Sequence, residues 1–276
     1  MLLHRILTAV PLAMAVIWLI LYQPTENLLF VLIPVSFICG YEWARLGGLQ
    51  SSAAQLAFAL LLSAFSWLCI NYFSQYGYLL LLLATAWWFA VLVFLKKVRP
   101  ELKSSVVSPA KLLVAFMVVP SAMSSIYIIH GIERGAEWLL YSMVLVWIAD
   151  SGAYFAGKKF GKNKLAPNVS PGKTLEGLWG ALIASTIYSV IASYYFNLTH
   201  SQSLLLIGLS LLLTIMSVAG DLYESFLKRE AGVKDSGRIL PGHGGILDRI
   251  DGVLPVMPLF VVFYDWLIMP VEGLYW

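Results

Sequence analysis

The sequence predicts an all-α, polytopic integral membrane protein with about nine transmembrane helices and a cytoplasmic amino terminus. Three observations predict this class: the composition, the recurrence of long apolar runs and the placement of Lys and Arg. Apolar residues make up 60% of the 276 residues and charged residues only 12%. The mean hydropathy of +0.81 exceeds what the core of a water-soluble protein of this length requires. The net charge of +3 is small, and nothing in the composition supports nucleic-acid binding.

Apolar runs long enough to cross about 30 Å of hydrocarbon recur along the chain. The first resembles a signal peptide, because Arg5 precedes it, but its small-residue triplet lies inside the run, which favours an uncleaved helix. The second is weak, since Glu42 and Arg45 intrude on its end. We expect spans at residues 5–22, 28–44, 53–74, 77–95, 112–131, 137–156, 177–196, 203–220 and 253–270.

The positions of Lys and Arg predict the orientation. With nine crossings and the amino terminus inside, every Lys and Arg except Arg134 falls on the inner side, as the positive-inside rule predicts for short loops. We divide the chain into residues 1–110, with helices 1–4 and a basic cytoplasmic loop, and residues 111–276, with helices 5–9. The second part carries two long inner loops, 157–176 and 221–252, where we expect the chemistry.

The loop after the eighth predicted span is densely charged, with eleven charged residues between positions 221 and 251. At about 2.5–3.5 kcal/mol for each charge at a bilayer centre, this segment must meet water or ions. Asp248 and Asp251 are three residues apart and would share one face of a helix. With Asp221 they could form an oxygen-lined pocket for Mg²⁺, which prefers such ligands. The alternative is a network of salt bridges with Arg229, Arg238 and Arg249.

A glycine-rich turn, Pro-Gly-His-Gly-Gly at 241–245, leads into the Asp248–Asp251 segment. Its glycines leave the backbone free to bring N–H groups to an anion, and a phosphate could also use the start of the following helix. A plain turn is the alternative, and His243 could be only a hydrogen-bonded loop residue instead of a phosphate or proton ligand. The surrounding cations are suited to phosphate oxygens: Lys228, Arg229, Lys234, Arg238 and Arg249.

The other long loop adds Asp150, at the end of the sixth span, and five lysines. Its Ser-Pro-Gly-Lys-Thr stretch is not a P-loop, because Pro167 stands where that motif needs its first glycine and no strand precedes it. We expect a polar helix entry that caps itself and presents Lys173 to an anion; its residues are Ser170, Lys173, Thr174 and Glu176. Capping alone is an equally good explanation for Ser170 and Glu176.

These motifs together resemble a known family. The resemblance rests on Ser225, Lys228–Arg229, Lys234–Asp235, the 241–245 turn and Asp248-Arg-Ile-Asp251. Residues 150–165 and 170–177 are similar to its second conserved block, and Tyr-Glu-Trp-Ala-Arg-Leu at 41–46 to its short amino-terminal motif. The family is phosphatidate cytidylyltransferase, also called CDP-diacylglycerol synthase.

The resemblance implies a homodimeric, Mg²⁺-dependent membrane enzyme that converts CTP and phosphatidic acid to CDP-diacylglycerol and pyrophosphate. It also implies a monovalent cation such as K⁺ beside the Mg²⁺. It makes Asp221 and Asp248 the leading metal ligands, with Asp251 as a third carboxylate, and we add Asp150 as a further candidate ligand. The expected catalytic residues are Asp221, Asp248, Lys173 and Arg249. The expected substrate-binding residues are Ser170, Lys228, Arg229, Arg238, His243, Gly244 and Gly245.

Two other functions remain open at this point. A CTP-dependent polyprenol kinase resembles the family in its nucleotide-binding region but would release CDP in place of pyrophosphate. An ion-coupled transporter would line a path with Asp150, Asp221 and Asp248, although transporters usually show paired repeats. For the enzyme we expect the bacterial inner membrane, with the site facing the cytoplasm and membrane lipids as neighbours.

Overall fold

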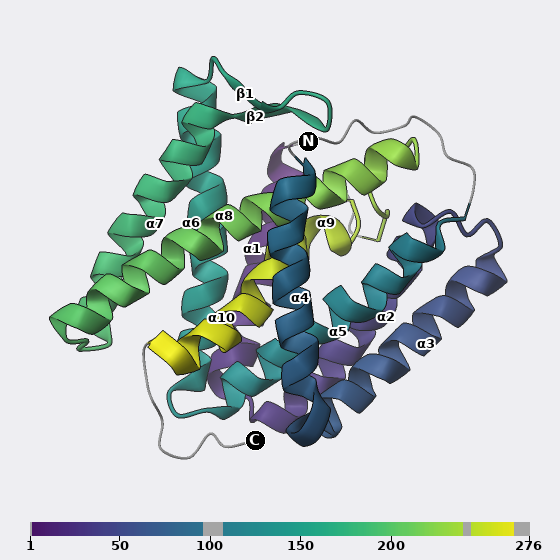
Figure 1. The fold of residues 1–276 in the computed structure, drawn as a ribbon, viewed down its shortest axis with the longest axis horizontal. Coiled ribbons are helices and arrows are strands. Elements are labelled where there is room, and N and C mark those ends of the chain that lie inside the picture. Colours follow the sequence, from purple (N-terminus) through teal and green to yellow (C-terminus); the bar gives the residue numbers. More distant parts are fainter. Residues whose placement is uncertain (1, 96–106, 240–243, 268–276) are drawn as a thin grey trace.

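The computed structural model describes residues 2–95, 107–239 and 244–267, and these residues are predominantly helical, which confirms the predicted fold class (Figure 1). A short 3₁₀ helix, Thr25–Leu28, leads into the second helix. The α-helices are α1 (Leu2–Tyr22), α2 (Leu29–Leu46), α3 (Ser52–Asn71), α4 (Phe73–Leu95), α5 (Pro109–Gly131), α6 (Gly135–Phe160), α7 (Leu175–Tyr195), α8 (His200–Glu230), α9 (Leu247–Ile250) and α10 (Val253–Leu267).

Seven helices in the described residues are long and apolar enough to cross a membrane, and α1 and α10 contribute shorter apolar stretches. Large apolar side chains face outward on these helices: Trp179, Ile183 and Ile187 of α7 are all more than half exposed. Such a face has no place in water and suits acyl chains. The chain is therefore a multi-pass membrane protein, while the count of nine spans and the side of the amino terminus stay predictions.

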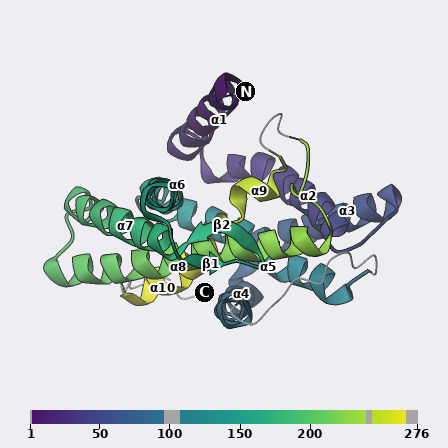
Figure 2. The same ribbon diagram turned by 90° about the horizontal axis from the view of Figure 1, so that it is seen from above.

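Aromatic contacts join the helices around α8. Tyr223 of α8 meets Trp43 of α2 and Trp88 of α4, with ring centroids 6.3 and 5.9 Å apart. Near the other end of the bundle, Trp138 of α6 stacks on Phe196 with centroids 3.7 Å apart. Seen from above, α1 lies at the edge of the molecule (Figure 2). The division of the chain at residue 110 stays a prediction.

Helix α8 extends ten residues beyond the predicted eighth span, from His200 to Glu230. The prediction of a loop beginning at residue 221 is therefore wrong for residues 221–230. The helix continues because Leu222, Tyr223, Phe226 and Leu227 recur at helical spacing and are buried. At 1.5 Å per residue its 31 residues measure about 46 Å, so Asp221, Lys228 and Arg229 stand on a rigid helix.

The other long inner loop contains an unpredicted antiparallel hairpin, β1 (Lys164–Ala166) and β2 (Ser170–Thr174), in which Lys164 pairs with Thr174 and Ala166 with Ser170. Turn-forming Pro167 and Asn168 lie between the strands. The hairpin projects from one end of the α6–α7 pair (Figure 1). The expected cap at Ser170 is wrong, because Ser170 lies in β2 and Thr174 is the N-cap of α7, accepting the Gly177 N–H at 3.1 Å.

Candidate active site

A cavity of about 440 Å³ lies between α6, the hairpin, the start of α7 and α8. Its volume falls in the range of small-molecule sites. Four charged residues line it: Asp150 and Lys158 from α6, Lys173 from β2 and Asp221 from α8. The remaining lining residues are Ala153, Tyr154, Gly157, Leu165, Gly172, Thr174, Gly177, Leu178 and Val218.

Lys173 and Asp221 form an ion pair on the cavity wall, with Nζ 2.6 Å from Oδ2. Lys173 Nζ also lies 3.5 Å from the Val218 carbonyl oxygen, and the Ser225 hydroxyl donates to Asp221 Oδ1 at 3.3 Å. The Asp221 side chain remains 37% exposed. The hairpin thus brings a cation across to α8, but it leaves the carboxylate open to water or a ligand.

Asp251 follows α9 and lies close enough to Asp221 and Asp150 for their charges to act on it. Its Oδ1 accepts the Gly252 N–H at 2.7 Å. Burial, followed by the charge of Asp221, raises the pKa of the Asp251 carboxyl to about 7, with Lys173 opposing. We name Asp150, Asp221 and Asp251 the acidic cluster. Within residues 2–95, 107–239 and 244–267, no three acidic, His or Cys side chains converge as a ready metal-ligand set.

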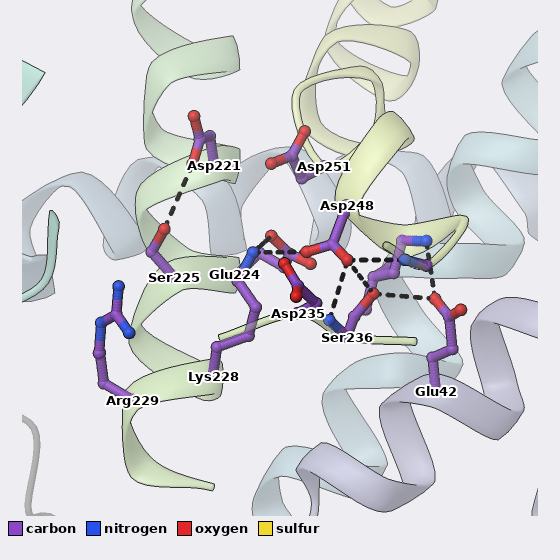
Figure 3. A network of polar contacts seen from close by, with 12 residues as sticks. Glu42, Asp221, Glu224, Ser225, Lys228, Arg229, Asp235, Ser236, Asp248 and Asp251 are labelled. Carbon is purple, nitrogen blue, oxygen red and sulfur yellow. Dashed lines mark hydrogen bonds and ion pairs between the residues drawn. The ribbon is translucent and has the colours of Figure 1, made fainter. Parts of the chain in front are cut away.

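Asp248 belongs to a different group of contacts (Figure 3). Its Oδ2 accepts the Ser236 N–H and hydroxyl, each at 2.9 Å, and the Gly245 N–H at 2.8 Å. Its Oδ1 lies 2.6 Å from Lys228 Nζ. Burial favours the neutral acid, but the hydrogen bonds from Lys228 and Gly245 outweigh it and lower the pKa of Asp248 to about 2. Asp248 therefore stays ionised at neutral pH.

Glu42 of α2 completes this second group. Its carboxylate accepts the Ser236 hydroxyl at 3.0 Å, the Ile246 N–H at 3.1 Å and the Leu247 N–H at 2.8 Å. These N–H groups begin α9, where the sequence analysis expected a phosphate. In this structure the Glu42 carboxylate accepts both of them. We name the group the polar clamp; its members are Glu42, Ser236, Gly245, Ile246, Leu247 and Asp248.

Lys228 connects the polar clamp to α8. Its Nζ lies 2.5 Å from Glu224 Oε2 as well as 2.6 Å from Asp248 Oδ1, and its side chain is only 13% exposed. Glu224 is almost fully buried, and its Oε1 has no hydrogen-bond partner among the described residues. Lys228, expected to hold a substrate phosphate, is thus bound between two carboxylates of the protein.

The other expected substrate ligands are dispersed. Arg229 Nε donates to the Val169 carbonyl oxygen at 3.4 Å, which ties α8 to the hairpin. Arg238 and Arg249 are exposed, and the charge of Arg249 acts on Asp150. Gly244 has a φ of 83°, a conformation that favours glycine. His243 lies outside the described residues.

The structure thus brings Asp150, Lys173, Asp221 and Asp251 together on one side and Lys228, Gly245 and Asp248 on the other. The catalytic, substrate-binding and metal-binding roles of these residues stay predictions. Sequence reasoning missed Glu42, Glu224 and Ser236 as members of the site. A signal for Glu42 was present, because a carboxylate inside an apolar run needs a partner.

Comparison with known proteins decides the family. The model of the family described as "Cytidylyltransferase family" matches residues 3–267. The chain belongs to the cytidylyltransferase family. The match covers both inner loops and every described member of the acidic cluster and the polar clamp, so these groups lie inside the family's shared region.

Three relatives within this family carry the name phosphatidate cytidylyltransferase. The one from Haemophilus influenzae is 37% identical and aligns over 96% of this chain and 99% of its own length. The one from Pseudomonas aeruginosa is 35% identical over 94% of this chain and 96% of its own length. The one from Staphylococcus aureus strain COL is 50% identical over 127 residues, which are 46% of this chain and 48% of its own.

Proposed function

We propose that this chain transfers the cytidylyl group of CTP to phosphatidic acid, giving CDP-diacylglycerol and pyrophosphate in phospholipid synthesis. The names of relatives that align over nearly the whole chain support the reaction. The location that we propose for the reaction rests on the cavity of about 440 Å³ with the Lys173–Asp221 ion pair on its wall. We infer that CTP enters this cavity from water while the lipid stays in its leaflet.

The chemistry of the reaction suits such a site. The phosphate of phosphatidic acid is already an anionic nucleophile, so neither a covalent intermediate nor a strong base is required. The barrier lies in bringing two anions together and in stabilising the charge of the leaving pyrophosphate. Lys173 and Lys158 line the cavity and supply fixed positive charge. We assign Lys173 to a phosphate of CTP, with Arg229, Arg238 and Arg249 as further candidates for phosphate contact.

Mg²⁺ fits the donor chemistry of the acidic cluster. Asp150 and Asp221 line the cavity, and Asp251 lies beside them. Mg²⁺ is commonly held by one or two carboxylates together with substrate phosphates and water, so a full protein cage is not required. When bound, the ion supplies neutralisation of phosphate charge. Asp248 is a weaker candidate ligand, because Lys228, Ser236 and Gly245 already occupy its oxygens.

We extend the proposal to the setting of the enzyme. A site on the cytoplasmic side of a bacterial inner membrane agrees with the distribution of Lys and Arg. A homodimer agrees with the family resemblance. The resemblance also implies K⁺ beside Mg²⁺, and that ion stays a prediction.

The deciding experiment incubates the purified protein with phosphatidic acid, Mg²⁺ and each of the four nucleoside triphosphates in turn. We expect CDP-diacylglycerol and pyrophosphate to form in equal amounts when the nucleotide is CTP, and neither product to form with the other three nucleotides. CDP in place of pyrophosphate would identify a kinase. Ion flux into proteoliposomes without CTP, together with no lipid product, would identify a transporter.

A further inference from the structure

Glu42 is far in sequence from the residues before α9 that it contacts, and we use "the turn" for the described residues 235–239 and 244–246. Glu42 is 2% exposed, and its hydrogen bonds go to this turn and to Leu247, the first residue of α9. Two backbone N–H groups and one hydroxyl surround the carboxylate. Among the described residues Glu42 forms no ion pair with Lys or Arg. A buried carboxylate held by neutral N–H and O–H donors, without a paired cation, is stable only if those donors stay in place. Glu42 and the start of α9 therefore fix each other.

Two glycines of the same turn leave room for this carboxylate. A Cβ on Gly237 or on Gly245 would overlap the Glu42 carboxylate oxygens. Neither glycine has a positive φ, so alanine is excluded by space and not by backbone conformation. The backbone thus closes around Glu42 from two sides.

Helix α2 contacts the turn through a second residue, Arg45, which lies three positions after Glu42. Arg45 donates to the carbonyl oxygen of Asp235 at 3.2 Å and to that of Ser236. The N–H of Ser236 donates to Asp248, and the Ser236 hydroxyl lies within hydrogen-bond distance of both Asp248 Oδ2, at 2.9 Å, and Glu42 Oε2, at 3.0 Å, so the two carboxylates share its one proton. A continuous set of contacts therefore runs from α2 through Ser236 to Asp248, and from Asp248 to Lys228 on α8.

We propose that Glu42 is a positioning residue for the cytidylyl transfer: it fixes the turn before α9, and through that turn it sets the place of Asp248 and Lys228. This inference rests on the proposed function, because the position of Asp248 and Lys228 matters to turnover only if the enzyme acts at this end of α8 and α9. Glu42 itself touches no reacting group.

The test is Glu42→Gln, which keeps the shape but turns an NH₂ group toward N–H and O–H donors. We expect kcat to fall roughly 10- to 100-fold, the usual effect of losing a residue that orients a ligand. The KM values for CTP and phosphatidic acid should change by less than about threefold, as for a loss confined to the transition state. Amide hydrogen exchange should accelerate in peptides covering 244–250 and not in peptides from α3.

Matched controls separate this effect from a general loss of folding. Glu26→Gln makes the same chemical change at an exposed carboxylate, and Gly208→Ala adds a methyl group where nothing lies within 4 Å. Both should retain wild-type kcat. Gly245→Ala should reproduce the loss caused by Glu42→Gln, and the double variant should lose little more, because both changes break the same contact.

The outcomes are distinguishable. If wild-type protein makes no CDP-diacylglycerol, the proposed function fails, while exchange at 244–250 still reports on the role of Glu42. A Glu42→Gln enzyme with kcat within about twofold of wild type overturns the inference, as does a fall in kcat matched by faster exchange throughout the chain. If that variant does not accumulate, Glu42→Asp decides, because it keeps the charge but shortens the side chain that reaches Ile246 and Leu247: a kcat reduced roughly 2- to 10-fold, the scale of one hydrogen bond, supports the inference, and an unchanged kcat overturns it.

Discussion

The acidic cluster and the polar clamp both contain carboxylates, but the two groups differ in how many hydrogen-bond donors those carboxylates have. Asp221 in the cluster has a cation and one hydroxyl as partners and remains 37% exposed. Asp248 in the clamp accepts four donors, and its side chain is 7% exposed. Asp248 and Asp251 are three residues apart, yet they belong to different groups. Asp221, with few donors, is available to a ligand, whereas Asp248, with many, is held in one position.

The largest expected effect comes from Asp221→Asn. We expect turnover to fall by about 10²–10³-fold or more, the scale for removing a key electrostatic group, while thermal stability changes little because the side chain is 37% exposed. Formation of CDP-diacylglycerol by detergent-purified protein measures the effect. Glu133→Gln, at an exposed site, is the control. Near wild-type turnover in Mg²⁺ would remove Asp221 from the site.

Asp248→Asn should distinguish the polar clamp from the acidic cluster by its effect on stability. Because it removes the charge that faces Lys228 and disturbs three hydrogen bonds, we expect a loss of both turnover and stability, of roughly 1–3 kcal/mol in the free energy of unfolding. Thermal unfolding in detergent, compared with Asp221→Asn, measures the difference. Equal stability of the two variants would contradict the distinction between cluster and clamp.

Lys173→Ala should cost less than either aspartate change. It removes the cation that faces Asp221 across the cavity, and we expect kcat/KM for CTP to fall roughly 10-fold, the scale of one charged hydrogen bond. Lys234→Ala is the matched change, since Lys234 is exposed and outside the cavity, and it should stay within about twofold. Initial rates at varied CTP give both values. Similar losses for the two lysines would argue against a role for Lys173 in binding CTP.

The last prediction concerns Asp251 and the pH dependence of stability, and its readout is unfolding and not turnover. Its pKa is about 7 in the folded protein against 3.8 as the reference value, so between these values the folded state holds the extra proton. Stability should therefore fall as pH rises from about 4 to about 7. In Asp251→Asn this contribution is absent. Thermal unfolding without divalent cations at pH 5 and pH 8 tests this, and equal pH dependence in both proteins would refute it.

The sequence predicted most of the helical fold because apolar runs of spanning length report directly on contact with lipid. It failed where burial is decided by tertiary packing. The continuation of α8 depends on Tyr223 packing against Trp43 and Trp88, which come from α2 and α4. The hairpin is too short and too polar to show a clear strand period.

For the site, the sequence indicated the right residue types but not their pairing. Spacing placed Asp248 and Asp251 on one helical face, yet it could not show that Lys228 and Ser236 would take the first and leave the second near Asp221. Glu42 was out of reach for a related reason: its contact with Ser236 joins residues 194 positions apart. Charge in an apolar run indicates that a partner exists but does not identify it.

Helix α8 gives the site a fixed relation to the membrane. One unbroken helix of 31 residues both crosses the bilayer and carries Asp221 and Lys228, and at about 46 Å it is longer than the hydrocarbon layer of about 30 Å. We therefore expect the distance between the cavity and the acyl chains to be set by helix α8 and not by a flexible loop. We also expect a thicker bilayer to bring Asp221 closer to hydrocarbon and turnover to depend on the acyl-chain length of the surrounding lipid.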